Sequence, residues 1–108
     1  MLASLPPVLY SRDQTRALDA ALIACGIAGL ELMQRAAAAA WSAVQQRWSR
    51  QRCMTVLCGA GNNAGDGYLL ARLAQAAGWQ VSIFTLSAPE RLQGDAALAW
   101  RQAQDAGI

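Results

Sequence analysis

The chain has 108 residues, a length at which one hydrophobic core is the upper limit. Its net charge is +2, and the basic residues, all of them arginine, form no cluster with aromatic side chains, so the composition excludes a nucleic-acid-binding surface. Histidine is absent, which excludes serine–histidine triads and the common zinc sites with histidine ligands.

The first predicted element is a short helix. Ser11 and Gln14 have the spacing of a capping box that opens a helix running to about Ala24. The segment 25–27, Cys-Gly-Ile, then ends it. One face of this helix is apolar and carries Leu18, Ala21 and Leu22.

A second helix is predicted from about Gly29 to Trp48. The five alanines 36–40 favour helix and present a smooth surface that packs close to a neighbour. Trp41 and Trp48 are seven residues apart and therefore share a face of a continuous helix. That spacing favours a stripe of the core over a site where a ligand stacks.

Two strand–helix units follow the helices. Each is an apolar run of strand-forming residues followed by a helical pattern that a glycine ends. The strands are predicted over 54–58 and 80–86, and the helices over 67–77 and 90–106, ended by Gly78 and Gly107. Sequential units of this kind form a parallel sheet with right-handed crossovers. The predicted fold class is therefore α/β, a Rossmann-like three-layer α/β/α arrangement with two leading helices.

The loop between the first strand and its helix is the most informative segment. Residues 59–67 read Gly-Ala-Gly-Asn-Asn-Ala-Gly-Asp-Gly. Its glycines let backbone amides approach a ligand, and the start of the helix adds partial positive charge, so the loop suits phosphate. Amide donors and side-chain oxygens that suit a polar ligand and a cation come from Asn62, Asn63 and Asp66.

Three other interpretations of this loop are disfavoured. It is not a Walker loop, because the chain contains no lysine. Gly59-x-Gly61-x-x-Ala64 fits a relaxed dinucleotide fingerprint, but the second strand holds no carboxylate for a ribose, which argues against an ordinary dehydrogenase. A purely structural turn would need only two or three residues to close.

The loop 59–67 resembles the Gly-x-Gly-Asn-Asn-Gly-Gly-Asp-Gly loop of the NAD(P)H-hydrate epimerase family, the YjeF-type N-terminal domain. Ala64 replaces the first glycine of the Gly-Gly pair. The resemblance covers nearly the whole chain, and further similar segments occur in the expected order at 10–19, 26–27, 32–36 and 94–96.

The resemblance implies both a domain and a reaction. The family domain is longer than this chain, so residues 1–108 are expected to be the N-terminal part of a single epimerase domain. The implied reaction interconverts the R and S epimers of hydrated NADH or NADPH. The implied functional partner is an NAD(P)H-hydrate dehydratase, fused downstream in some bacterial proteins, and a homodimer is an assembly to test.

The resemblance also implies site residues. The substrate is expected to contact Asn62, Asn63, Ala64, Gly65 and Asp66. Asn63 is the implied ligand of a potassium ion, and its neutral amide oxygen suits a weakly hydrated monovalent cation better than Mg²⁺. The acid/base residue is expected beyond Ile108, so the 108-residue chain is expected to be inactive alone. We expect a negative φ at Ala64 and a close backbone–ligand approach at Gly65.

A non-catalytic scaffold of the same fold, as in RNA-decapping assembly proteins, is the alternative function. In those relatives the loop has degenerated, whereas this chain keeps Asn62, Asn63, Gly65 and Asp66, which favours a ligand site. Because two strands are only the start of a parallel sheet, we also expect marginal stability and association through Val81, Ile83 and Phe84.

The cysteines and apolar runs predict the compartment. Cys25, Cys53 and Cys58 form no Cys-x-x-Cys pair, and Cys58 has no histidine partner that could make it a nucleophile. Residues 1–7 lack the charged start of a secretory leader, and the apolar run 36–44 is far shorter than the ~20 residues of a membrane span. We therefore expect a cytoplasmic protein without a membrane partner.

Overall fold

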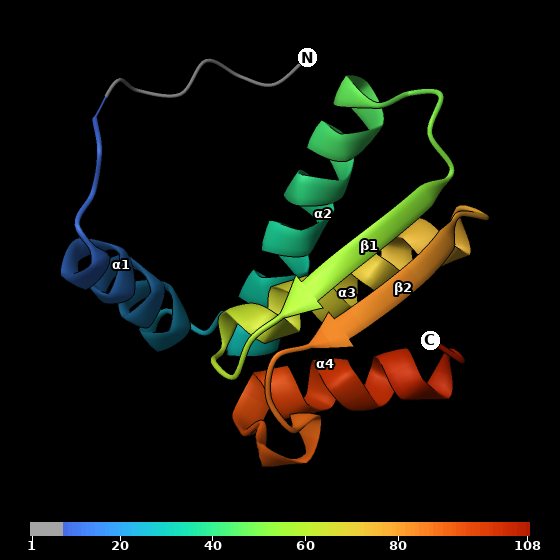
Figure 1. Ribbon diagram of the computed structural model, residues 1–108. Coiled ribbons are helices and arrows are strands. Elements are labelled where there is room, and N and C mark those ends of the chain that lie inside the picture. Colours follow the sequence, from blue (N-terminus) through green and yellow to red (C-terminus); the bar gives the residue numbers. More distant parts are fainter. Residues whose placement is uncertain (1–7) are drawn as a thin grey trace.

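The computed structural model describes residues 8–108, so the prediction about a leader at 1–7 concerns residues outside the described part. The elements follow one another along the chain as Figure 1 shows. They are α1 (Arg12–Ala24), α2 (Gly29–Arg47), β1 (Cys53–Cys58), α3 (Asn63–Ala76), β2 (Gln80–Thr85), the 3₁₀ helix η1 (Pro89–Arg91) and α4 (Gly94–Asp105). No helix within residues 8–108 is long and apolar enough to cross a membrane.

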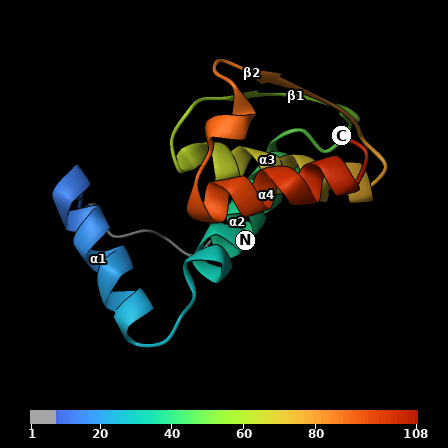
Figure 2. The same cartoon turned by 90° about the horizontal axis from the view of Figure 1, so that it is seen from below.

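The two strands form a parallel sheet, which confirms the predicted α/β class. Cys53 pairs with Gln80 and Cys58 with Thr85, so β1 and β2 run in register over their whole length. Helices α2, α3 and α4 all lie on one face of this sheet (Figure 2). Within residues 8–108 no helix covers the opposite face, so two of the three expected layers are described.

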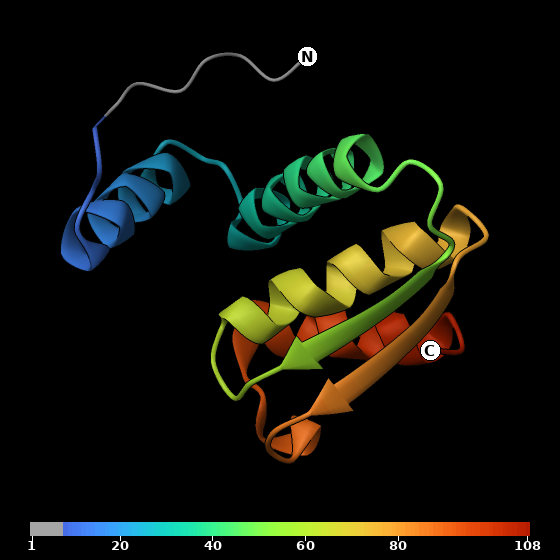
Figure 3. The same cartoon turned by 45° about the horizontal axis from the view of Figure 1, so that its top comes forward.

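The core lies around α3, which follows the strands and has α2 and α4 as neighbours (Figure 3). Its buried aromatic and aliphatic side chains are Tyr68 and Leu69. The facing surface of α4 is made of alanines, three or four residues apart, which allow the two helices to approach closely. These buried alanines are Ala96, Ala99 and Ala103.

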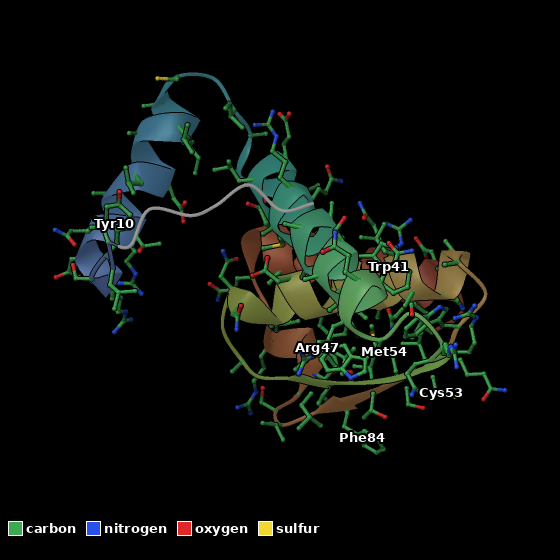
Figure 4. All side chains as sticks on the ribbon, turned by 90° about the horizontal axis from the view of Figure 1, so that it is seen from above. Tyr10, Trp41, Arg47, Cys53, Met54 and Phe84 are labelled. Atoms are coloured by element: carbon green, nitrogen blue, oxygen red, sulfur yellow. The ribbon has the colours of Figure 1, made fainter. Side chains whose placement is uncertain are left out.

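Alternate side chains of each strand point to opposite faces of the sheet. Val81 and Ile83 are partly buried on the helix side, whereas Phe84 is 58% exposed and points away from the helices (Figure 4). Val81 and Ile83 therefore lie on the other face of the sheet from Phe84, so the three side chains do not form one surface. Association through them stays a prediction. The exposed face pairs Phe84 with Leu57 across the two strands, and Leu57 is 68% exposed.

The capping box that opens α1 is confirmed. The Ser11 backbone N–H donates to Gln14 Oε1 at 2.8 Å, and the Gln14 N–H donates to Ser11 Oγ at 3.1 Å. The apolar face of α1 is nevertheless exposed, because α1 lies apart from the rest of the molecule and has no buried residue (Figure 1). Leu18, Ala21 and Leu22 thus share a helix face without reaching the core.

The predicted tryptophan stripe of α2 is wrong at Trp48. Helix α2 ends at Arg47, and Trp48 follows with φ −127° and ψ 59°, which takes its side chain off the helical face; it is 52% exposed. Trp41 is partly buried and packs edge-on against Trp79, with ring centroids 5.0 Å apart.

Two predicted helix starts also differ from the structure. Helix α3 begins at Asn63, four residues earlier than predicted, because the residues after Asn62 take helical rather than loop conformations. The helix predicted over 90–106 is divided into η1 and α4, since Leu92 and Gln93 are extended and Gly94 has a φ of +58°. The predicted helix ends are confirmed, with φ +89° at Gly78 and +85° at Gly107.

Candidate functional site

The polar loop lies at the carboxyl end of β1, the edge at which parallel α/β sheets bind ligands. Residues 59–62 connect β1 to α3 and are all exposed. A Cβ added at Gly59 or Gly61 would meet nothing within 4 Å, and neither glycine has a positive φ. Crowding and backbone strain within the described chain therefore do not account for glycine at these two positions.

Close packing against two other helices explains why position 65 is a glycine. A Cβ there would collide with Met33 Sδ on α2 and would lie 2.7 Å from Met33 Cε and 3.1 Å from the Cα of Ala96 on α4. Gly65 is thus a packing position at which α3 meets both neighbouring helices. The expectation that it cannot carry a side chain is supported by this packing, and its contact with a ligand stays a prediction.

The first turn of α3 directs its residues to two sides. Ala64 and Gly65 are buried towards the core, and the φ of Ala64 is not positive, as expected. Their N–H groups donate to the carbonyls of Gly61 and Asn62, both at 3.0 Å. In residues 8–108 the backbone N–H groups of 59–63 donate to no carbonyl, so these five are the amides best placed for an anion.

Asn62 and Asn63 point outwards. Both are exposed, and Asn62 is the N-cap residue of α3 without using its side chain as a cap. Among the described residues neither side chain makes a hydrogen bond to another part of the chain. Their amide groups are therefore available to a ligand.

A pocket of about 240 Å³ opens beside this turn. It is lined by residues from four elements: Asp19 and Ile23 of α1, Gly29, Leu32, Met33 and Ala36 of α2, Asn62 and Asp66 at the start of α3, and Asp95 at the start of α4. Three carboxylates thus surround one pocket, although in residues 8–108 no three acidic or thiol groups are close enough together to hold a metal ion.

The environment of Asp66 favours its protonated form. Burial raises the pKa of Asp66 above its usual value, and the negative charge of Asp19 raises it further. Both causes disfavour the carboxylate. Asp66 therefore holds a proton more tightly than an ordinary aspartate does, which is the property that a proton donor needs.

Cys58 completes the surroundings of the loop without being a reactive group. Its side chain is 1% exposed, and its Sγ lies 3.8 Å from the carbonyl oxygen of Ala64. Burial raises the pKa of this thiol, so it stays protonated and is a poor nucleophile.

Of the five predicted site residues, the structure places Asn62 and Asp66 in the lining of this pocket. Asn63 is exposed beside the pocket, and Ala64 and Gly65 are buried in the core. Sequence reasoning missed Asp19 and Asp95, because each looks like an ordinary charge on an exposed helix. The position of Asp95 directly after Gly94 was a usable signal, since the segment 94–96 is one of those similar to the epimerase family.

Comparison with known proteins gives consistent results. The family model of the YjeF-related protein N-terminus matches residues 29–108. The bifunctional NAD(P)H-hydrate repair enzyme Nnr of Coxiella burnetii is 44% identical over 92 residues, which are 85% of this chain and 19% of that protein. The NAD(P)H-hydrate epimerase of Rhodobacter capsulatus is 41% identical over 96 residues, covering 82% of this chain and 45% of the relative.

A third relative extends the match along the chain. The NAD(P)H-hydrate epimerase of Rhodopirellula baltica is 37% identical over 105 residues, 96% of this chain and 42% of its own length. The chain therefore spans less than half of the length of these relatives. Since the family model covers most of its residues, the chain belongs to the family of the YjeF-related protein N-terminus.

Proposed function

We propose that this chain provides the nucleotide-binding part of an NAD(P)H-hydrate epimerase, which interconverts the R and S epimers of hydrated NADH or NADPH. The observation that carries the proposal is the open loop 59–63 beside a pocket with a partly buried Asp66 whose pKa is raised. The names and identities of the relatives support it. Because the chain spans less than half of those relatives, the complete reaction is proposed for the longer protein.

Two neighbouring parts of the site suit two different parts of the proposed ligand. The amides of 59–63 and the positive end of α3 suit the pyrophosphate, which is anionic. The adjacent pocket is polar at Asn62 and Asp66 and apolar at Met33, so it suits a flat ring with an amide and a hydroxyl group. Asn62 and Asn63 are exposed, and their side chains are free to bind a ligand. This argues against a non-catalytic scaffold, which would not require asparagine at these positions.

Epimerisation at the hydrated carbon requires a proton at the departing oxygen. Protonation there lets the hydroxyl leave as water, and water then adds to the opposite face of the ring and returns a proton. The raised pKa of Asp66 suits it to hold a proton or to orient the hydroxyl. We further propose that the principal acid/base residue belongs to the part of the longer relatives that this chain does not match.

Interconverting the two epimers does not by itself restore the cofactor, because the product is still a hydrate. We therefore propose as functional partner an NAD(P)H-hydrate dehydratase that consumes one of the two epimers. Several relatives are named bifunctional repair enzymes, which supports a fused partner. The cytoplasm is the proposed location, since a repair of soluble cofactors takes place where those cofactors are used.

Binding of hydrated NADH tests the proposal directly. In this chain, NMR amide shifts at 59–63 are expected to change on addition of hydrated NADH. Gly61→Ala is expected to reduce the affinity at least ten-fold, which corresponds to about 1.4 kcal/mol. Its added Cβ lies in open space, so the melting temperature stays unchanged.

Gly65→Ala is the matched control, because it adds the same methyl group four residues further along. Its methyl group collides with Met33, so it is expected to lower the melting temperature. The proposal fails if hydrated NADH shifts no amide of 59–63, or if Gly61→Ala binds as well as the original chain.

Potassium is the proposed ion of the site, held by the amide oxygen of Asn63. This side chain is exposed and neutral, which suits a weakly hydrated monovalent cation. Potassium is expected to strengthen the binding of hydrated NADH more than sodium does, and Asn63→Ala to remove the difference. Calorimetric titrations in the two salts measure this, and a stronger effect of Mg²⁺ than of potassium would contradict it.

A further inference from the structure

Arg72 of α3 has hydrogen-bond donors that the described chain does not use. Its Nη1 donates to Gln102 Oε1 on α4 at 2.8 Å, whereas its buried Nε has no hydrogen-bond partner among the described residues. The Nη2 atom, on the same edge of the guanidinium as Nε, also makes no hydrogen bond within residues 8–108. A buried donor without an acceptor destabilises a folded chain, so this edge of Arg72 calls for an acceptor.

Arg72 lines a pocket of about 320 Å³ between α2 and α3, which lie side by side in Figure 3. The only other polar side chain in the lining is that of Gln34 on α2. The remaining walls are aliphatic and comprise Ala37 and Ala38 of α2 and Leu69, Leu73 and Ala76 of α3. The volume is that of a small-molecule site, for which about 300 Å³ is the lower end of the usual range.

The positive charge of Arg72 is not balanced by a carboxylate of the described chain. The only ion pair within residues 8–108 joins Glu31 to Arg35, and no acidic residue lines the pocket. Gln34 is neutral. The pocket therefore combines one unpaired cation with aliphatic walls.

These walls determine which acceptor suits the pocket. An ordered water makes about three hydrogen bonds, and aliphatic walls offer it few partners beyond Arg72. Inorganic phosphate has the same disadvantage, because its oxygens point in all directions. The two oxygens of a carboxylate match the parallel N–H groups of a guanidinium edge, and an apolar chain attached to the carboxylate can cover the alanine and leucine side chains.

We propose that the pocket at Arg72 binds a small organic monocarboxylate with a short apolar chain. The carboxylate would pair with the Nε–Nη2 edge of Arg72, and the Gln34 amide would donate a further hydrogen bond to it. This site shares no lining residue with the pocket beside Asp66, so it does not depend on the proposed function. A ligand here would contact both α2 and α3 and would stabilise the folded chain by mass action.

Titration of this chain with 4-methylpentanoate, followed by NMR, tests the proposal. The Arg72 Nε–H signal is expected to shift, together with the methyl signals of Leu69 and Leu73, and the melting temperature to rise with ligand concentration. The neutral 4-methylpentanamide has a similar shape, and its binding is expected to be about ten-fold weaker or worse because it lacks the charge-assisted pair. Acetate and inorganic phosphate are expected to bind more weakly as well, because neither covers the aliphatic walls.

Two variants test the role of the guanidinium edge. Arg72→Lys keeps the positive charge but removes the paired N–H groups, and Gln34→Glu supplies a carboxylate within the chain that competes with the ligand. Each is expected to weaken the binding of 4-methylpentanoate about ten-fold or more. Arg101→Lys is the matched control, because Arg101 is exposed on α4 and lies outside the pocket, so its binding is expected to stay unchanged. A melt of each variant without ligand shows whether it is folded.

The proposal is overturned if 4-methylpentanoate leaves the Arg72 Nε–H signal unchanged, or if folded Arg72→Lys binds it as tightly as the original chain. Equal binding of 4-methylpentanamide or of inorganic phosphate would also overturn it, because the pocket would then select only for shape or only for charge. No hydrated NADH enters these measurements. Failure of this proposal therefore leaves the proposed function standing, and failure of hydrated NADH to bind leaves this proposal standing.

Discussion

Asp66 is the residue whose charge state most affects the site. Its pKa is raised by burial and by Asp19, so the folded chain binds a proton at Asp66 more tightly than the unfolded chain does. The stabilising effect of the protonated group is complete at a pH below the unfolded pKa. It is lost as the pH rises through the folded pKa.

Asp66→Asn is therefore expected to raise the melting temperature at neutral pH. The gain should shrink as the pH falls through the folded pKa of Asp66, where the original side chain is also neutral. Thermal melts across an acidic pH series measure the difference. As a control, Asp19→Asn is expected to lower the pKa of Asp66 in a carboxyl NMR titration, and an unchanged pKa would rule out the influence of Asp19.

At the scale of the helices, Arg72 links α3 to its neighbours incompletely. Its Nη1 donates to Gln102 Oε1 on α4 at 2.8 Å, whereas its buried Nε has no hydrogen-bond partner among the described residues. Gln34 of α2 lines the same pocket of about 320 Å³. The only ion pair within residues 8–108 joins Glu31 to Arg35, so Arg72 has no carboxylate partner there.

Gln34→Glu is expected to provide that partner. A partly exposed pair of this kind contributes about 0.5–1 kcal/mol, or about 2–8 °C in melting temperature for a chain of this size. The gain should disappear in an Arg72→Gln background, which a double-mutant cycle of thermal melts measures. A gain that persists without Arg72 would show that the helices are not coupled through this pair.

Helix and strand positions were predictable wherever a local signal exists. The capping box at Ser11 and the left-handed glycines 78 and 107 each act within a few residues, and the structure confirms all three. The start of α3 was misplaced because Asn63 to Asp66 carry both loop and helix-start chemistry. The close packing of Gly65 against Met33 of α2 and Ala96 of α4 favours the helical conformation, and the local sequence does not reveal this packing.

The site was predictable only in its sequence-contiguous part. The loop 59–67 can be recognised from its composition alone. Asp19 and Asp95, in contrast, lie in the same pocket as Asp66 only because of how α1, α3 and α4 are arranged. The exposure of Trp48 was unpredictable for a similar reason, since a stripe of a helix exists only as far as the helix continues. Both the core and the pocket depend on contacts between residues far apart in the sequence, and these contacts could not be predicted from local sequence patterns.

At the scale of the whole molecule, one face of the sheet has no helix over it within residues 8–108. Leu57 and Phe84 are neighbours in the strand register and are 68% and 58% exposed. Burying two such side chains stabilises an association by about 1.5–3 kcal/mol each. We therefore expect this chain to self-associate through this face, and the homodimer proposed for the family stays a separate prediction.

Leu57→Ser combined with Phe84→Ser is expected to shift the chain towards monomer in sedimentation velocity runs. Leu18→Ser is the control, because Leu18 is 51% exposed on α1, away from the sheet. If the control dissociates the chain as strongly as the double variant does, association proceeds through α1 instead.

The alanine surface between α3 and α4 also determines which walls of the pocket can move. Alanine has no rotamers, so the two helices meet without side chains that could readjust, and Asp66 and Asp95 belong to one stiff unit. Asp19 belongs to α1, which has no buried residue to hold it. The pocket thus has one wall held by the packing of α3 against α4 and one wall on a helix outside the core. Because the charge of Asp19 contributes to the raised pKa of Asp66, a displacement of α1 would lower that pKa and could be followed by titrating Asp66.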